Sequence, residues 1–183
     1  ISMSGQFSTH ITSSIFAGFI LAFPYVFWEF WRFISPALHA NETKMARGIV
    51  FFSSVLFLMG VLFGYYVLAP LSVNFLGSYQ VSSSVANQIS LTSFISTVTT
   101  VSFATGIVFE LPVMTYFFTK IGLLTPEFMR IYRKHAIVMI LILAAIITPP
   151  DVTSQILVLL PLIVLYEISI KISERVVRNQ EKS

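Results

Sequence analysis

The sequence predicts an all-α protein, a polytopic bundle of helices that crosses a membrane several times. Three observations support this: the balance of apolar and charged residues, the long stretches without charge, and the placement of the basic residues. Of the 183 residues, 56% are hydrophobic and only 10% are charged, whereas a soluble domain has about 25% charged residues. Because so few polar side chains cannot cover a water-soluble core, we expect the lipid bilayer to surround most of the apolar surface.

Uncharged stretches predict five spans, which form one transmembrane domain over residues 1–183. Their approximate ranges are 11–30, 48–76, 94–119, 135–148 and 152–170. The last two are short, since their apolar parts would reach only about 20–22 Å as helices, less than the roughly 30 Å of the hydrocarbon core. They form either two short crossings, which we favour, or a re-entrant hairpin.

The basic residues fall in three places: between the first and second predicted spans, between the third and fourth, and in the tail. They are Arg32, Lys44 and Arg47; Lys120, Arg130, Arg133 and Lys134; and Lys171, Arg175, Arg178 and Lys182. Basic loops stay in the cytoplasm, so these loops and the C-terminus are predicted to be cytoplasmic. The segment that begins at Ile1 is then outside. We therefore expect an N-terminal segment and one more span before it in the intact protein, giving six spans.

Glu110 is the main candidate for a functional residue within the spans. It precedes Lys120 by about 15 Å of helix rise, which places it near the middle of the bilayer. An ionisable group is costly there and is a functional hypothesis by default. We expect it to face a concave, partly wet surface beside a bend at Pro112. The alternative is a structural glutamate, protonated and bonded to a backbone carbonyl that Pro112 leaves free or to a neighbouring Ser or Thr.

Other polar residues have simpler explanations when the sequence is taken alone. Glu42 lies in a basic loop, where a solvated pair with Lys44 or Arg47 would contribute little. Gln155 would make an ordinary hydrogen bond between helices. Pro149, Pro150 and Asp151 suit a water-facing turn between the last two spans.

Several function classes are excluded or disfavoured. The chain has no cysteine, which rules out disulfides and thiolate metal sites, and the three histidines are too scattered for a metal site. We expect no cofactor, no nucleic-acid partner and no enzymatic activity, because nucleotide-binding and nucleophile–base patterns are missing. A proton-coupled small-solute secondary transporter that uses Glu110 remains the alternative, although no internal repeat supports it.

Three segments resemble the C subunit of the twin-arginine protein translocase, the TatC family. They are FISPALHANE from Phe33, FATGIVFELPV around Glu110, and TPPDVTSQ up to Gln155, and the resemblance extends over essentially the whole chain. It implies a receptor in the bacterial plasma (inner) membrane that binds the twin-arginine signal peptides of folded precursor proteins. Export would use the proton-motive force, in an oligomeric complex with single-span partner subunits.

The resemblance also implies roles for individual residues. Glu42, with Phe33, Pro36 and Leu38, would bind the signal peptide, because a guanidinium group forks onto a carboxylate. Glu110, Pro112 and Gln155 would form a polar cluster in the membrane that contacts the partner subunits. Pro149, Pro150 and Asp151 match the family's outer turn between the last two helices.

Overall fold

The computed structural model describes residues 3–34, 46–79, 89–148 and 152–181, and its regular structure in these ranges is entirely helical. The helices, in chain order, are α1 (Met3–Ile34), α2 (Ala46–Phe63), the π-helical turn η3 (Gly64–Leu68), α3 (Ala69–Ser78), α4 (Leu91–Val108), α5 (Leu111–Lys120), α6 (Pro126–Ile131), α7 (Arg133–Ile147) and α8 (Val152–Glu181). The predicted all-α class is confirmed.

Within the described residues, four helical stretches are long and apolar enough to cross a membrane, whereas the sequence predicts five spans. They are Gly5–Phe33, Gly48–Ser78, Leu91–Lys120 and Val152–Gln180. α7 is short, as expected: its 15 residues rise about 22 Å. α8 is longer than expected, with 30 residues, because its second half still buries one face among its neighbours. The buried residues of that half include Ser169, Ile170, Ser173 and Val176.

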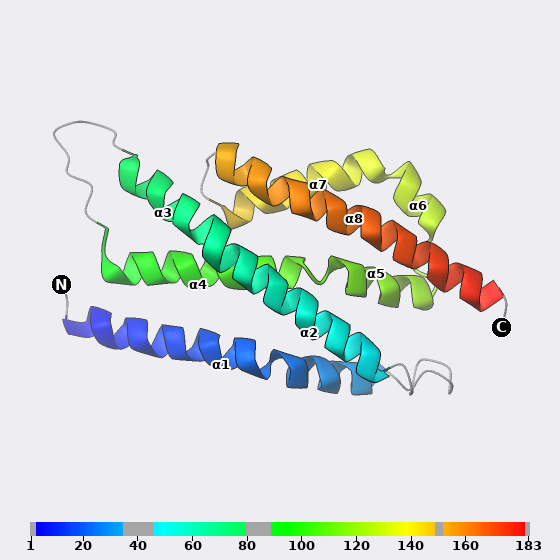
Figure 1. Ribbon diagram of the computed structural model, residues 1–183, viewed down its shortest axis with the longest axis horizontal. Helices are drawn as coiled ribbons and strands as arrows, with labels where there is room; N and C mark the ends of the chain where they lie inside the picture. The colour runs from blue at the N-terminus through cyan, green and yellow to red at the C-terminus, as the bar shows by residue number, and fades with distance from the viewer. Residues whose placement is uncertain (1–2, 35–45, 80–88, 149–151, 182–183) are drawn as a thin grey trace.

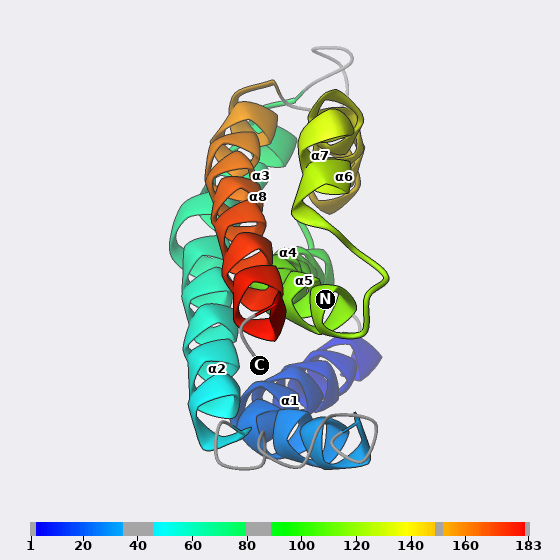
Figure 2. The same cartoon turned by 90° about the vertical axis from the view of Figure 1, so that its right-hand side faces the viewer.

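The helices lie along the long axis of the molecule, and successive helices end alternately at its two ends. In Figure 1, the end of α1, the start of α2, α6 and the C-terminus lie at the right-hand end. The N-terminus, the end of α3, the start of α4, the end of α7 and the start of α8 lie toward the left. Figure 2 shows α1 at one edge of the bundle and the α6–α7 pair on the opposite side, with α4 and α5 between them.

Two hydrophobic clusters hold the bundle together. One joins η3, α4, α7 and α8 through Leu68, Val101, Val108, Phe109, Ile140, Ala144, Val158, Leu162 and Leu165. The other joins α1, α2 and α5 through Phe27, Trp31, Val50, Leu56, Val113 and Phe117. The rings of Phe23 and Phe57 stack between α1 and α2, with their centroids 3.6 Å apart. Burial in these clusters fixes which face of each helix points inward.

α2 and η3 cross α4 at a very short distance. A Cβ atom added at Gly64 would lie 2.6 Å from the Cα of Ser102, and one at Gly106 would lie 2.7 Å from Val61 Cγ2. Small residues at such crossings let helix backbones approach and pack. The wider π turn lies just before Pro70, whose missing amide cannot complete a normal helical turn. This crossing sets the position of α2 against the α4–α5 segment that carries Glu110.

Candidate functional site

Glu110 lies at a break between two helices. α4 ends at Val108 and α5 begins at Leu111, so Glu110 is in the turn that joins them. Its amide donates to the carbonyl of Ile107 at 3.0 Å, which is a tighter turn than an α-helix makes. Pro112 follows in the first turn of α5, where its missing amide is tolerated. The bend expected from Pro112 is therefore present, as an interruption of the helix.

The carboxyl group of Glu110 is enclosed by the chain itself. The residue is 6% exposed, and the Ser53 hydroxyl on α2 donates to its Oε2 at 2.7 Å. The other oxygen, Oε1, is buried and has no hydrogen-bond partner among the described residues. A buried polar atom without a partner costs about 1–3 kcal/mol. Contrary to the expectation of an open, partly wet surface, Glu110 is covered, and half of its hydrogen-bonding capacity is unused.

The structure does not bring Gln155 to Glu110. The amide Nε2 of Gln155 makes a long hydrogen bond, 3.4 Å, to the carbonyl of Leu141 on α7. Leu165, rather than Gln155, shares a hydrophobic cluster with Phe109, and it lies about 15 Å further along α8. The predicted polar cluster is thus corrected. Glu110 is paired with Ser53, and Gln155 joins the first turn of α8 to α7.

Sequence reasoning missed Ser53. A faint signal exists, because Ser53 and Ser54 are adjacent hydroxyl residues in the otherwise apolar α2. Ser54 donates to the carbonyl of Val50 in its own helix at 2.7 Å, which is the usual arrangement for a serine inside a helix. Which of the two serines reaches across to Glu110 depends on the rotation of α2, and the sequence alone does not give it.

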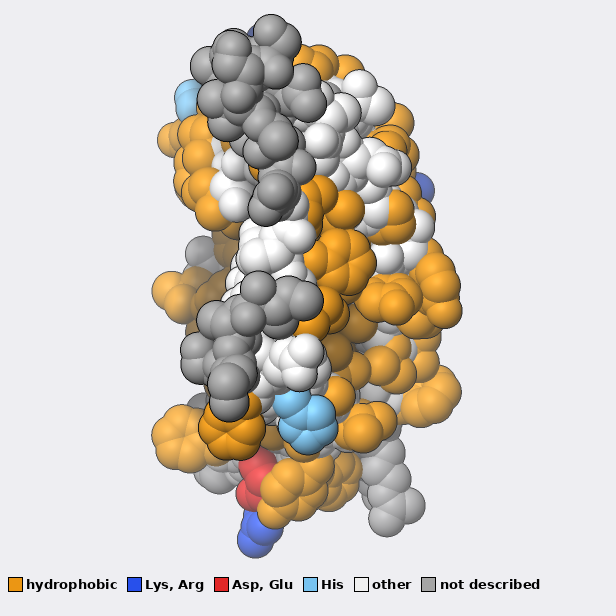
Figure 3. Space-filling model, turned by 90° about the vertical axis from the view of Figure 1, so that its left-hand side faces the viewer, with side chains coloured by type: hydrophobic (Ala, Val, Ile, Leu, Met, Phe, Trp, Pro, Cys, Tyr) orange, Lys and Arg blue, Asp and Glu red, His pale blue; other side chains and the backbone are white. Residues whose placement is uncertain are grey.

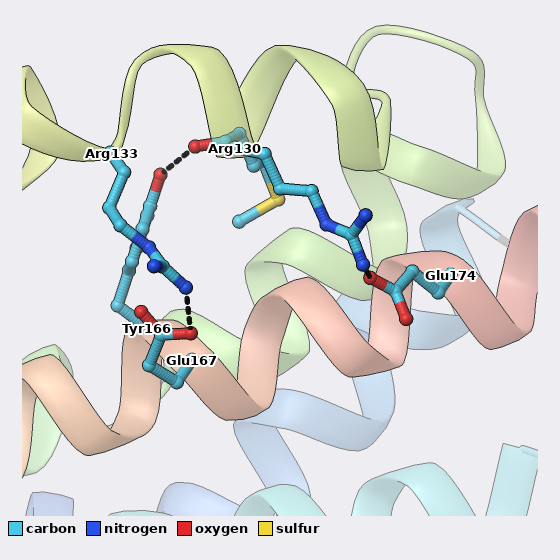
Figure 4. A network of polar contacts seen from close by, with 6 residues as sticks. Arg130, Arg133, Tyr166, Glu167 and Glu174 are labelled. Atoms are coloured by element: carbon cyan, nitrogen blue, oxygen red, sulfur yellow. Dashed lines mark hydrogen bonds and ion pairs between the residues drawn. The ribbon is translucent and has the colours of Figure 1, made fainter.

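Polar contacts fasten the second half of α8 to its neighbours. Figure 4 shows Arg130 of α6 paired with Glu174, and Arg133 of α7 paired with Glu167. The hydroxyl of Tyr166 donates to the carbonyl of Met129 at 2.8 Å. Two further contacts join α8 to α5. Thr119 donates to Ser173 at 2.9 Å, and Gln180 donates to the carbonyl of Lys120 at 3.1 Å.

The basic side chains gather at this end of the molecule. Basic residues in the described ranges lie at the end of α1, the start of α2, the end of α5, in α6, at the start of α7 and in the second half of α8, all toward the right in Figure 1. Figure 3 looks onto the opposite end, where hydrophobic and uncharged polar side chains dominate and basic ones show only at the margins.

Comparison with known families decides what kind of protein this is. The family model described as "Sec-independent protein translocase protein (TatC)" matches residues 1–161. The chain belongs to the TatC family. This confirms the resemblance seen in the sequence.

Two TatC relatives show how much of the family's length is present. The Sec-independent protein translocase protein TatC of Blattabacterium sp. subsp. Periplaneta americana is 46% identical over 169 residues, which cover 92% of this chain and 64% of that protein. The TatC protein of Helicobacter pylori strain J99 is 45% identical over 163 residues, which cover 89% of this chain and 65% of that protein. The chain thus spans less than two thirds of these relatives, and the further span expected before Ile1 stays a prediction.

A solved structure supports the TatC fold. The crystal structure of a twin-arginine translocase receptor TatC in DDM superposes with a TM-score of 0.76 at 38% identity, covering 93% of this chain and 76% of that one. An all-helical, multi-pass membrane architecture is therefore established for this TatC chain.

The residues that the TatC resemblance assigns to the signal peptide lie at the end of α1 and beyond it. Phe33 is 84% exposed, whereas Trp31, two residues earlier, is buried with its ring 5.2 Å from that of Phe117 on α5. The remaining residues of this group, and those of the outer turn, fall outside the described residues: Pro36, Leu38 and Glu42, and Pro149, Pro150 and Asp151. In the described ranges, His, Asp and Glu side chains form no group of three that could hold a metal ion.

Proposed function

We propose that this chain is the membrane-embedded receptor part of a twin-arginine translocase, which recognises twin-arginine signal peptides and helps to export folded proteins. Membership in the TatC family carries this proposal. The proton-motive force drives transport, since the sequence has no nucleotide-binding loop of the Walker type. The chain needs no cofactor and catalyses no reaction of its own.

The charge distribution supports a definite orientation. In the bacterial inner membrane, the end that carries α6 and the C-terminus is cytoplasmic, because positively charged loops resist translocation. The connections α3–α4 and α7–α8 are then on the outer side, and α7 is a short fifth crossing. Local thinning of the bilayer accommodates such a short helix at modest cost.

The signal-peptide site lies on the cytoplasmic side, between α1 and α2. The exposed ring of Phe33 lies there, in the last turn of α1. Pro36, Leu38 and Glu42 follow in the connection to α2. The carboxylate of Glu42 binds the guanidinium groups of the signal peptide. A bidentate pair between guanidinium and carboxylate is stronger and more directional than a pair with the ammonium group of lysine.

Glu110 contacts the single-span partner subunits. Its unpaired Oε1 supports this role, because a polar side chain from a partner helix would satisfy it. Hydrogen bonds between membrane helices contribute about 0.6–2 kcal/mol each. That is enough to set the register of a weakly held partner.

Peptide binding to the full-length protein tests the receptor proposal. A labelled peptide that carries the twin-arginine motif should bind, and the same peptide with two lysines should bind at least about tenfold more weakly, the loss expected for a charge-assisted pair of 1.5 kcal/mol or more. Equal affinity for both peptides would reject the proposed recognition. Proton-driven uptake of a small solute into vesicles that contain the protein would instead support the transporter alternative.

A further inference from the structure

The hydroxyl of Ser53 donates to a carboxylate outside its own helix, whereas several neighbouring hydroxyl groups bond within their own helix. Ser54, Ser102 and Thr105 each donate, at 2.7 Å, to the carbonyl four residues earlier in their own helix. Ser53 is completely buried and donates to the carboxylate of a residue 57 positions later. It therefore links α2 to the turn between α4 and α5. A serine that bonds to a carbonyl of its own helix makes no such link.

Only one of the two carboxyl oxygens of Glu110 is hydrogen-bonded in this closed arrangement. Ser53 satisfies Oε2, but Oε1 is buried without a partner in the described part of the chain. Enclosing that oxygen carries a penalty similar in size to the gain from one hydrogen bond. The contact with Ser53 therefore decides whether the carboxyl stays covered or becomes accessible.

The surroundings leave room for local movement. A pocket of about 140 Å³ lies between α2, α5 and α8. Its walls include Phe52, Pro112 and Ile172, and neither Ser53 nor Glu110 lines it. Phe52 precedes Ser53, and Pro112 follows Glu110 by two residues. The helix is already interrupted at Glu110. A shift of the first turn of α5 away from α2 would thus break little helical hydrogen bonding, and the contact of α5 with α2 is already loosened by this pocket.

We propose that Ser53 is a latch that keeps the Glu110 carboxyl closed between α2 and the α4–α5 turn. A partner helix docks at Glu110 only when this hydrogen bond breaks. The inference rests on the proposed function, in which Glu110 contacts a single-span subunit. The partner it requires is a membrane helix whose polar side chain donates a hydrogen bond to the freed carboxyl group and so replaces the Ser53 hydroxyl.

Chemical accessibility of Glu110 tests the latch directly. The full-length protein, in vesicles without partner subunits, is treated with dicyclohexylcarbodiimide, an apolar reagent that modifies carboxyl groups within membranes. Modification of the peptide that contains Glu110 is followed by mass spectrometry. Ser53→Ala should speed this modification roughly two- to tenfold, the factor that corresponds to one hydrogen bond. Ser54→Ala is the matched control and should leave the rate unchanged, since Ser54 bonds only to its own helix.

An unchanged or slower reaction in Ser53→Ala would overturn the latch, provided that the variant matches the wild type in membrane abundance and thermal stability. Crosslinking to a partner subunit gives the second readout. Ser53→Ala should raise the crosslinking yield in the absence of precursor protein. If modification is faster but the yield falls, Ser53 orients the carboxyl for docking and does not occlude it. If Glu110→Ala leaves the yield unchanged, the docking site itself is wrong, which is a separate failure.

Discussion

At the scale of single residues, Glu110 shows how burial and incomplete hydrogen bonding define a site. Its carboxyl group is covered by helices, yet one oxygen has no partner among the described residues. A group that served only to stabilise the bundle would be expected to have both oxygens satisfied. The unpaired oxygen therefore favours a role in binding over the purely structural alternative.

Substitutions at Glu110 should separate these two roles. Glu110→Gln keeps a donor and an acceptor and should retain most of the association with partner subunits. Glu110→Ala removes both and should lower association by about 0.6–2 kcal/mol, which is roughly three- to thirtyfold. The measurement is the yield of site-specific crosslinks to a partner helix at equal membrane abundance. Equal yields for Glu110→Ala and the wild type would return Glu110 to the structural alternative.

A second prediction concerns the loop acid Glu42. Glu42→Ala should weaken the capture of twin-arginine precursors by roughly 1.5–3 kcal/mol if the charge pair is partly shielded, and by much less if it is solvated. Glu29→Ala is a suitable control, because Glu29 is also exposed near the end of α1, where its carboxylate lies 3.7 Å from Arg32. Crosslinking of a precursor to each variant measures the effect. A loss that is the same for both variants would mean that general charge, and not a specific pair, is being read.

The sequence predicted Glu110 but neither its partner nor its burial. A single acid in an apolar stretch is visible without any structure. Its link to Ser53 depends on the rotation of α2 about its axis. That rotation is set by two close contacts with α4, one of Gly64 with Ser102 and one of Gly106 with Val61. Gln155 was grouped with Glu110 through the resemblance alone, and in the structure its amide bonds to the carbonyl of Leu141 on α7.

At the scale of helices, charge-free stretches located the spans well, and packing decided the rest. The predicted range 48–76 corresponds to Gly48–Ser78, and 94–119 lies within Leu91–Lys120. The predicted span 152–170 lies within α8, and the helix continues to Glu181 with charged residues on one side of its second half. The other side is buried against α5, which includes the contact of Ser173 with Thr119. Amphipathic extensions of this kind escape a search for uncharged windows.

The close crossing of α2 and η3 over α4 predicts that a larger residue at Gly64 destabilises the bundle. Gly64→Ala should lower the free energy of unfolding by about 1–3 kcal/mol, the range for overpacking a close contact. The added methyl group would meet the backbone of Ser102, which cannot rotate away. Gly18→Ala is the matched control, since a Cβ there meets nothing within 4 Å, and alanine stabilises a helix relative to glycine. Thermal unfolding in detergent compares the two, and equal destabilisation would contradict the proposed crossing.

At the scale of the whole molecule, basic residues that are far apart in the sequence lie at the same end of the structure. Alternate connections are basic in the sequence, and the helices bring the described basic residues to one end (Figure 1). The charge pattern does not decide whether α7 crosses the membrane, because the segment before α7 and the end of α8 are both basic. In Figure 1 the end of α7 and the start of α8 stop short of the level reached by the end of α3 and the start of α4, so the depth of these two helix ends in the bilayer decides between a short crossing and a re-entrant hairpin.

Single cysteines can settle this orientation, since the chain has none of its own. We expect Ser78→Cys, at the end of α3, to react with a membrane-impermeant thiol reagent in intact cells. Leu123→Cys, 71% exposed between α5 and α6, should react only after the membrane is opened, because basic residues hold that end in the cytoplasm. Val152→Cys, 70% exposed at the start of α8, should behave like Ser78→Cys if α7 crosses the bilayer. Protection of Val152→Cys alone would identify a hairpin that does not reach the outer surface, and reversal of the first two results would invert the whole topology.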